Sequence, residues 1–113
     1  MSAVLPVSGV AKNVQTGKLN ASASGNTRLV DAPGATSKIR VLAVVLTSTL
    51  ANTIKFQSET TDITATFPVG AAAGMVLPFT EHGWFDCAAG QPLNFNQSVA
   101  TATGVSIRYA IIN

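Results

Sequence analysis

Apolar and polar side chains alternate with a period of two residues in short segments of this chain, and Gly, Pro or Asn residues separate these segments. Successive side chains of a β-strand point to opposite faces, so this alternation is typical of strands that are buried on one face. About eight such segments at spacings near ten residues predict an all-β chain, a single-domain antiparallel β-sandwich or jelly roll. The expected strands are 27–30, 38–49, 52–58, 62–67, 75–80, 84–87, 93–96 and 104–112.

Residues 38–49 are the strongest candidate strand. Lys38 and Arg40 alternate with apolar neighbours, and the run from Val41 to Leu46 is then apolar at every position. A strand with two apolar faces is typical of a central strand that is covered on both sides. We therefore expect a second sheet or a neighbouring subunit to cover it.

Residues 1–25 contain few large apolar side chains and are rich in Ser, Ala, Gly and Asn. We expect them to form an N-terminal arm or an ordinary first strand, and residues 26–113 to form the β-sandwich domain. The stretch 17–25 is interpreted as a flexible tether, because glycine and serine favour mobile chain. The arm would become ordered against a partner through four aliphatic side chains, Val4, Leu5, Val7 and Val10.

The chain has 113 residues, enough for one hydrophobic core, and only 11% of them are charged, against about 25% in ordinary soluble domains. The net charge of +2 comes from charges scattered singly along the sequence. This pattern argues against a nucleic-acid arm and a polybasic membrane patch, so we expect no nucleic-acid partner and no membrane partner. A charge-poor surface is easily desolvated, which favours a surface covered by other protein over that of a neutral monomer.

Four basic residues fall at outward positions of the expected strands. They would form either a basic stripe for an anionic partner or ordinary solvated strand faces. The four are Arg28, Lys38, Arg40 and Lys55.

Residues 81–87 contain the only cluster of reactive side-chain types, including His82 and Cys87. In an extended segment these two side chains are roughly 16 Å apart, too far for a hydrogen-bonded catalytic pair. We expect His82 to be a loop residue and Cys87 to be a core residue. A single cysteine also leaves a structural zinc site without its usual thiolates. The sequence therefore predicts no catalytic residue, no metal site, no cofactor and no enzyme activity.

Trp84 is the one aromatic residue whose role the sequence leaves open. It follows a glycine and precedes Phe85, and either a core position or a binding position fits this context. Tryptophan is enriched at interface hot spots, so Trp84 is a candidate interaction residue. Together with Phe79, Phe85 and Phe95 it could alternatively form a platform on which a sugar stacks.

Six runs in the sequence carry a resemblance to a known class of protein. Together they resemble small virion proteins of tailed bacteriophages, in particular head decoration (cement) proteins, and the resemblance covers residues 26–113. The runs are 26–34 (NTRLVDAPG), 38–42 (KIRVL), 54–56 (IKF), 83–85 (GWF), 89–95 (AGQPLNF) and 104–109 (GVSIRY).

This resemblance implies a β-sandwich without catalytic residues that sits on the outside of the phage head. It implies binding to the major capsid protein and to copies of the same chain, with a homotrimer expected before a dimer. The protein would be made in the host cytoplasm and would stabilise the shell of the virion. The alternative is a receptor- or carbohydrate-binding module of a tail or head fibre, which would use Trp84.

Overall fold

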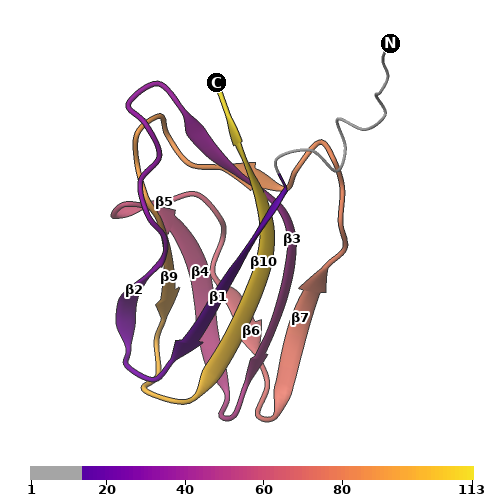
Figure 1. Ribbon diagram of the computed structural model, residues 1–113. Helices are drawn as coiled ribbons and strands as arrows, with labels where there is room; N and C mark the ends of the chain where they lie inside the picture. The colour runs from indigo at the N-terminus through magenta and orange to yellow at the C-terminus, as the bar shows by residue number, and fades with distance from the viewer. Residues whose placement is uncertain (1–13) are drawn as a thin grey trace.

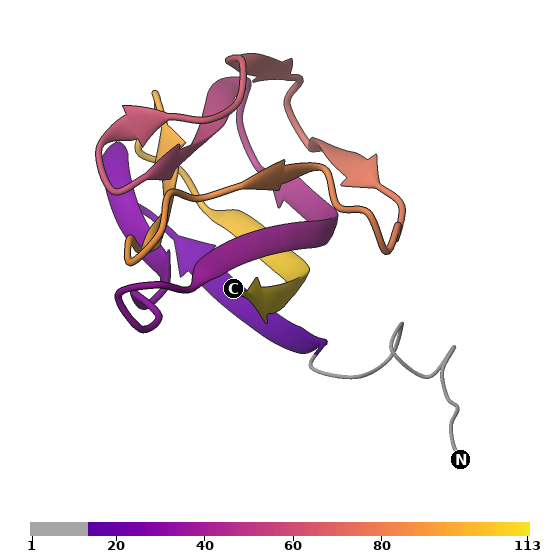
Figure 2. The ribbon, with the colours of Figure 1, turned by 90° about the horizontal axis from the view of Figure 1, so that it is seen from above.

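The computed structural model describes residues 14–113, which form two antiparallel sheets of five strands each, packed face to face (Figure 1). Sheet A has the order β1-β10-β3-β7, and β8 also pairs with β3; sheet B has the order β2-β9-β4-β5, and β6 also pairs with β4. The two layers are also visible from above (Figure 2). This architecture confirms the predicted all-β sandwich. The strands are β1 (Gln15–Ala21), β2 (Gly25–Val30), β3 (Lys38–Ser48), β4 (Asn52–Ser58), β5 (Thr61–Asp62), β6 (Phe67–Val69), β7 (Ala73–Leu77), β8 (Phe85–Asp86), β9 (Leu93–Gln97) and β10 (Thr103–Ile112).

The hydrophobic core lies between the two sheets and consists of the inward-facing side chains of the alternating segments. Phe56 and Phe95 are fully buried and contact edge to face, with ring centroids 5.7 Å apart. Phe85 packs against Phe56 at 5.2 Å. These positions confirm the inward faces that the alternation predicts for 52–58, 93–96 and 104–112. The largest other members of the core are Ile39, Val41, Val44, Leu46, Ile54, Leu93, Val105 and Ile107.

A β-bulge interrupts β3 where it pairs with β10. Tyr109 lies opposite Val41 and Arg108 lies opposite Ala43, so Leu42 is an extra residue in β3. Such a bulge reverses which face the following residues occupy, because side chains alternate strictly on either side of it. Leu42 is buried outside the main core cluster, and its carbonyl accepts a hydrogen bond from the backbone of Thr80.

The bulge explains the apolar run that the sequence shows in β3. Val41 points into the core before the bulge, and Val44 and Leu46 point into it afterwards. Val45 points outward and is 51% exposed. Within the described chain, sheet B therefore covers one face of β3, and the second face stays open at Val45.

Residues 15–21 are a strand and not the loop that the sequence analysis expects from residue 17 onward. β1 pairs with β10 along its whole length, from Gln15 opposite Tyr109 to Ala21 opposite Thr103. Gly17 faces the core, where a Cβ would lie only 3.0 Å from Cγ1 of Ile107. The core leaves room only for a small residue at position 17, and for this reason the sequence of β1 lacks the large apolar residue expected at an inward position. The four proposed anchors Val4, Leu5, Val7 and Val10 lie outside the described residues.

The expected strand 62–67 is also wrong, because it is replaced by the two short strands β5 and β6 with an irregular segment between them. The hydroxyl of Thr64 accepts a hydrogen bond from the backbone N–H of Phe56 on β4. This side-chain bond takes the place of the backbone bond that a continuous neighbouring strand would make to Phe56. The strand expected at 75–80 begins at Ala73 and ends at Leu77, before Pro78. It is an edge strand, as the proline predicts.

Candidate binding surfaces

Trp84 lies in the connection between β7 and β8, residues 78–84, and its side chain is 45% exposed. Its indole Nε1–H donates a hydrogen bond to the carbonyl of Pro78 at 2.8 Å, and its backbone N–H bonds to Val41. Phe79, in the same connection, is also about half exposed. Phe95 is fully buried, so the four aromatic residues do not form one stacking platform.

The 78–84 connection packs closely against Arg40 of β3, and an ion pair joins the following strand β8 to the same arginine. Arg40 forms two hydrogen bonds to Asp86, of 2.9 and 3.0 Å, and these raise the pKa of the guanidinium above its ordinary value. Gly83 has a φ of 82°, and a Cβ there would lie 2.5 Å from Cγ of Arg40. Position 83 therefore requires glycine, both for its backbone conformation and for its close approach to Arg40.

His82 and Cys87 do not form a catalytic pair. Cys87 is 2% exposed, and this burial raises the pKa of its thiol to about 11. His82 is exposed in a turn. These placements confirm a core cysteine and a loop histidine. Across residues 14–113, no three His, Cys, Asp or Glu side chains gather in a way that could hold a metal ion.

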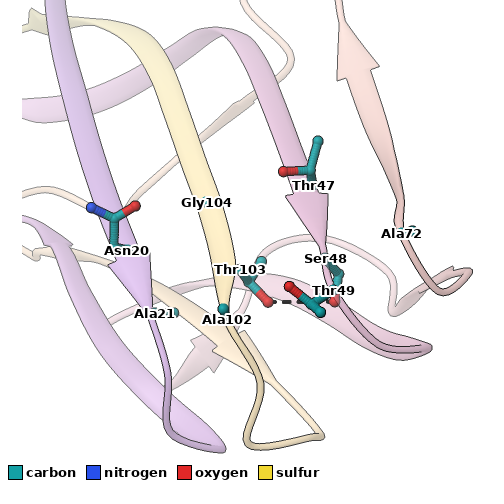
Figure 3. Close-up of a pocket in the computed structure, with 9 residues that line it drawn as sticks. All are labelled: Asn20, Ala21, Thr47, Ser48, Thr49, Ala72, Ala102, Thr103 and Gly104. Atoms are coloured by element: carbon teal, nitrogen blue, oxygen red, sulfur yellow. Dashed lines mark hydrogen bonds between the residues drawn. The ribbon is translucent and has the colours of Figure 1, made fainter.

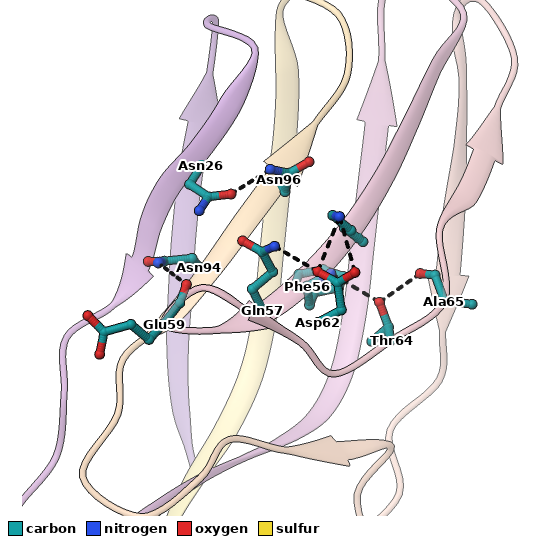
Figure 4. A network of polar contacts seen from close by, with 10 residues as sticks. Asn26, Phe56, Gln57, Glu59, Asp62, Thr64, Ala65, Asn94 and Asn96 are labelled. Atoms are coloured by element: carbon teal, nitrogen blue, oxygen red, sulfur yellow. Dashed lines mark hydrogen bonds and ion pairs between the residues drawn. The ribbon is translucent and has the colours of Figure 1, made fainter.

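The outer face of sheet B carries a network of polar side chains that bond to one another (Figure 4). Arg28, Asn94, Gln57 and Asp62 form one row across β2, β9, β4 and β5. Arg28 Nε donates to Asn94 Oδ1 at 3.1 Å, and Gln57 Nε2 donates to Asp62 Oδ1 at 2.7 Å. The hydrogen bonds from Gln57 and then from Lys55 lower the pKa of Asp62 below its ordinary value.

The acceptor Oε1 of Gln57 is buried in this network and has no hydrogen-bond partner among the described residues. The other amides of the face are engaged. Asn96 donates to Asn26, and Asn94 donates to the carbonyl of Glu59. Sheet B therefore presents side chains whose polar groups are largely satisfied within the chain.

The four basic residues singled out in the sequence do not form a stripe. Arg28 and Lys55 lie on sheet B, whereas Lys38 and Arg40 lie on sheet A. Three of the four are paired with an aspartate, in the ion pairs Arg28–Asp31, Arg40–Asp86 and Lys55–Asp62. The prediction of a basic stripe is therefore wrong. The alternative, that these side chains belong to ordinary strand faces, is correct for the three paired residues.

The outer face of sheet A differs from that of sheet B, because it combines exposed apolar side chains with positive charge. Val45 on β3 and Val76 on β7 lie opposite each other and are 51% and 64% exposed. Lys18 lies in the same row across the sheet, opposite Ser106 of β10, and Arg108 lies two residues further along β10 on the same face. The strands β1, β3, β7 and β10 contain no Asp or Glu.

A trough runs along the outer side of β10, between β1 and β3. It consists of two adjoining open depressions of about 430 and 280 Å³, which share Asn20, Thr47 and Gly104. Figure 3 shows Asn20 and Thr47 on either side of Gly104, which has no side chain to fill the floor. Lys18 and Val45 line the second depression, so the trough leads from Gly104 toward the exposed valines. We call this feature the β10 trough.

Sequence reasoning missed Lys18, Val76, Gly104 and Arg108 as members of one surface. The sequence pattern places Lys18 in a loop, and nothing in a single sequence pairs β1 with β10. Alternation alone placed Arg108 outward, but the neighbours of its strand were unknown. The available signal was the lack of acids in 15–21, 38–48, 73–77 and 103–112, which becomes informative only once these segments share a sheet.

No protein family matches this chain, and no curated protein or solved structure is significantly similar to it. Residues 14–113 include no helix of the length and hydrophobicity needed to cross a membrane.

Proposed function

We propose that this chain is a structural virion protein that decorates the outer surface of a bacteriophage head and binds the major capsid protein. The observation that carries the proposal is the contrast between the two sheets. Four of the five large hydrophobic side chains that are exposed within residues 14–113 belong to β3, β7 and the 78–84 connection, and the fifth is Leu50. The four are Val45, Val76, Phe79 and Trp84.

Exposed apolar side chains grouped on one side of a small domain are typical of a surface that another protein covers. The outer face of sheet B suits contact with solvent, because its amides and charges already bond to one another. A decoration protein needs many modest contacts and no single strong one, because symmetric multivalent attachment raises the overall affinity. The resemblance of residues 26–113 to phage head decoration proteins supports the same function.

Self-association is part of the proposal. Copies would contact one another outside the outer face of sheet A, which is left for the shell, and symmetric homo-oligomers are the usual form of such assemblies. A homotrimer is expected before a dimer, because the proteins that the sequence resembles often surround three-fold axes of the shell. Val4, Leu5, Val7 and Val10 are proposed as further anchors to the shell or to a neighbouring copy.

A receptor- or carbohydrate-binding module of a tail or head fibre is the second candidate. The half-exposed ring of Trp84, with Phe79 in the same connection, favours it, since aromatic faces are common contacts for ligands. The indole N–H of Trp84 is engaged by Pro78, so only the ring face is free for such a ligand.

Co-sedimentation separates the two candidates. The purified protein is mixed with empty heads of the phage that encodes it, prepared without this protein, and separately with host cells. Decoration predicts that the protein pellets with heads at a fixed stoichiometry and does not pellet with cells. Pelleting with host cells alone would contradict decoration and support the fibre module.

A further inference from the structure

Positive charge is unbalanced on sheet A alone. The described part of the chain has three basic side chains outside its ion pairs, and all three lie on this sheet, Lys18 on β1, Lys38 on β3 and Arg108 on β10. Each is exposed and alternates with inward-facing neighbours, so each points away from the core. The one acid of sheet A, Asp86 on β8, is paired with Arg40.

The same face permits close approach by a partner. The β10 trough has Gly104 at its floor, with Asn20 and Thr47 on either side (Figure 3). Val45 and Val76 stand beside the trough. A partner can therefore bury apolar surface and reach Lys18 at the same time.

We propose that the outer face of sheet A is the docking surface of this protein, and that it binds an acidic protein surface. Carboxylate side chains of the partner pair with Lys18 and Arg108, and its small apolar side chains cover Val45 and Val76. This inference rests on the proposed function, because it names the chemistry of the capsid surface that the decoration protein would recognise.

The charge and the apolar side chains of this face together select this partner over three others. A second copy docked through the same face would bring two positively charged faces together, which is unfavourable. The chain's own residues 1–13 contain Lys12 and no acid, so they supply no carboxylate. A nucleic acid would place phosphates against the two valines, and the face has no aromatic side chain on its strands β1, β3 and β7 for base stacking.

The test compares two variants of this face with a control on the other sheet. Lys18→Gln with Arg108→Gln removes two positive charges. Gly104→Ala fills the floor of the trough, where the new Cβ would lie 3.9 Å from Asn20 Oδ1, an ordinary contact that the fold accommodates. The control, Thr61→Glu with Thr66→Glu, makes the same change in net charge at exposed positions on the side of sheet B, one in β5 and one in the segment between β5 and β6.

Binding of each protein to nuclease-treated empty heads is measured by co-sedimentation over a range of salt concentrations, after circular dichroism confirms the fold. The charge variant is expected to bind about tenfold more weakly at low salt and to lose most of its salt dependence. Gly104→Ala is expected to weaken binding about threefold or more, and the control to stay within about twofold of the original protein.

The outcomes separate the two levels of the proposal. If the unmodified protein does not pellet with heads, the proposed function is wrong. If it pellets but both sheet A variants behave as the control does, decoration stands and the assignment to sheet A is wrong. If it instead binds double-stranded DNA more tightly than heads, and the charge variant loses that binding, the acidic protein partner is wrong.

Discussion

Gly74 on β7 passes so close to Leu46 on β3 that a side chain at Gly74 would overlap the carbonyl oxygen of Leu46. Backbone atoms cannot move aside as the end of a flexible side chain can. We expect Gly74→Ala to destabilise the fold by about 1–3 kcal/mol, because β7 must shift away from β3. Urea denaturation followed by circular dichroism measures this loss.

Gly70→Ala is the matched control for this prediction. Its new Cβ would meet only Cβ of Ala73, at 3.8 Å, so the free energy of unfolding should change by less than about 0.5 kcal/mol. Equal effects of the two substitutions would show that β7 does not pack against β3 as closely as described.

Gln97 joins the two sheets at one end of the sandwich. Its Oε1 accepts hydrogen bonds from Asn52 on β4 and Thr103 on β10, and its Nε2 donates to the carbonyls of Ala23 and Thr101. Gln97→Leu would leave these buried groups without partners, and we expect a loss of about 3 kcal/mol. Thermal and urea unfolding measure it.

Asn96→Ala provides the comparison, because the neighbouring Asn96 is partly exposed and its side chain bonds, among the described residues, to Asn26 alone. That substitution should cost less than about 1 kcal/mol. A Gln97→Leu variant as stable as Asn96→Ala would mean that Gln97 does not join the sheets.

The thiol of Cys87 should be unreactive in the native protein. With a pKa of about 11 and 2% exposure, only about one thiol in a thousand is ionised at pH 8, and reagents cannot reach it. Ellman's reagent should therefore modify native protein very slowly and guanidinium-unfolded protein at once. Fast modification of the native form would contradict the burial of Cys87 between the sheets.

Asp62 makes the free energy of unfolding depend on pH in the acidic range. Its folded pKa lies below the ordinary value of 3.8, so the folded state favours the ionised carboxylate. The stabilisation is complete above the unfolded pKa and is lost as the pH falls through the folded pKa. An NMR titration should show Asp62 with a midpoint below 3.8, and Gln57→Leu should raise that midpoint more than Lys55→Met, because the hydrogen bond from Gln57 is the larger cause. A midpoint that neither substitution moves would contradict the network on sheet B.

Truncation tests the role of residues 1–13 separately from that of β1. A chain that begins at residue 14 keeps every pairing of β1 with β10 and should melt within a few degrees of the full chain. A chain that begins at residue 25 loses β1 and should be strongly destabilised. If Val4, Leu5, Val7 and Val10 are anchors, the shorter truncation should reduce binding to heads without changing the melting temperature. Unchanged binding would remove these four residues from the proposed contact.

The fold was predictable because most inward positions are large and apolar while their neighbours are polar. The prediction failed where packing demanded the opposite. Gly17 is small because Ile107 and Val30 already fill the space beneath β1, so that strand carries little hydrophobic signal. The bulge at Leu42 changes which residues of β3 face the core, so a strand with one buried face has the sequence pattern of a strand buried on both faces.

The sequence context of Trp84 fits either a core position or a binding position, and the structure places its side chain half in solvent. The larger surface was not predictable. Lys18, Arg108 and Val76 become neighbours only through the pairing of β1, β10, β3 and β7, which connects segments up to about ninety residues apart. Long-range pairing of this kind leaves no local pattern in one sequence.

A cryo-electron microscopy reconstruction of the intact phage head tests the central claim most directly. The account predicts density for this sandwich on the outer surface of the shell, with sheet A facing the major capsid protein and the polar network of sheet B facing solvent. Lys18 and Arg108 should lie beside carboxylate side chains of the shell. A head without such density, or a sandwich attached through the outer face of sheet B, would contradict the account.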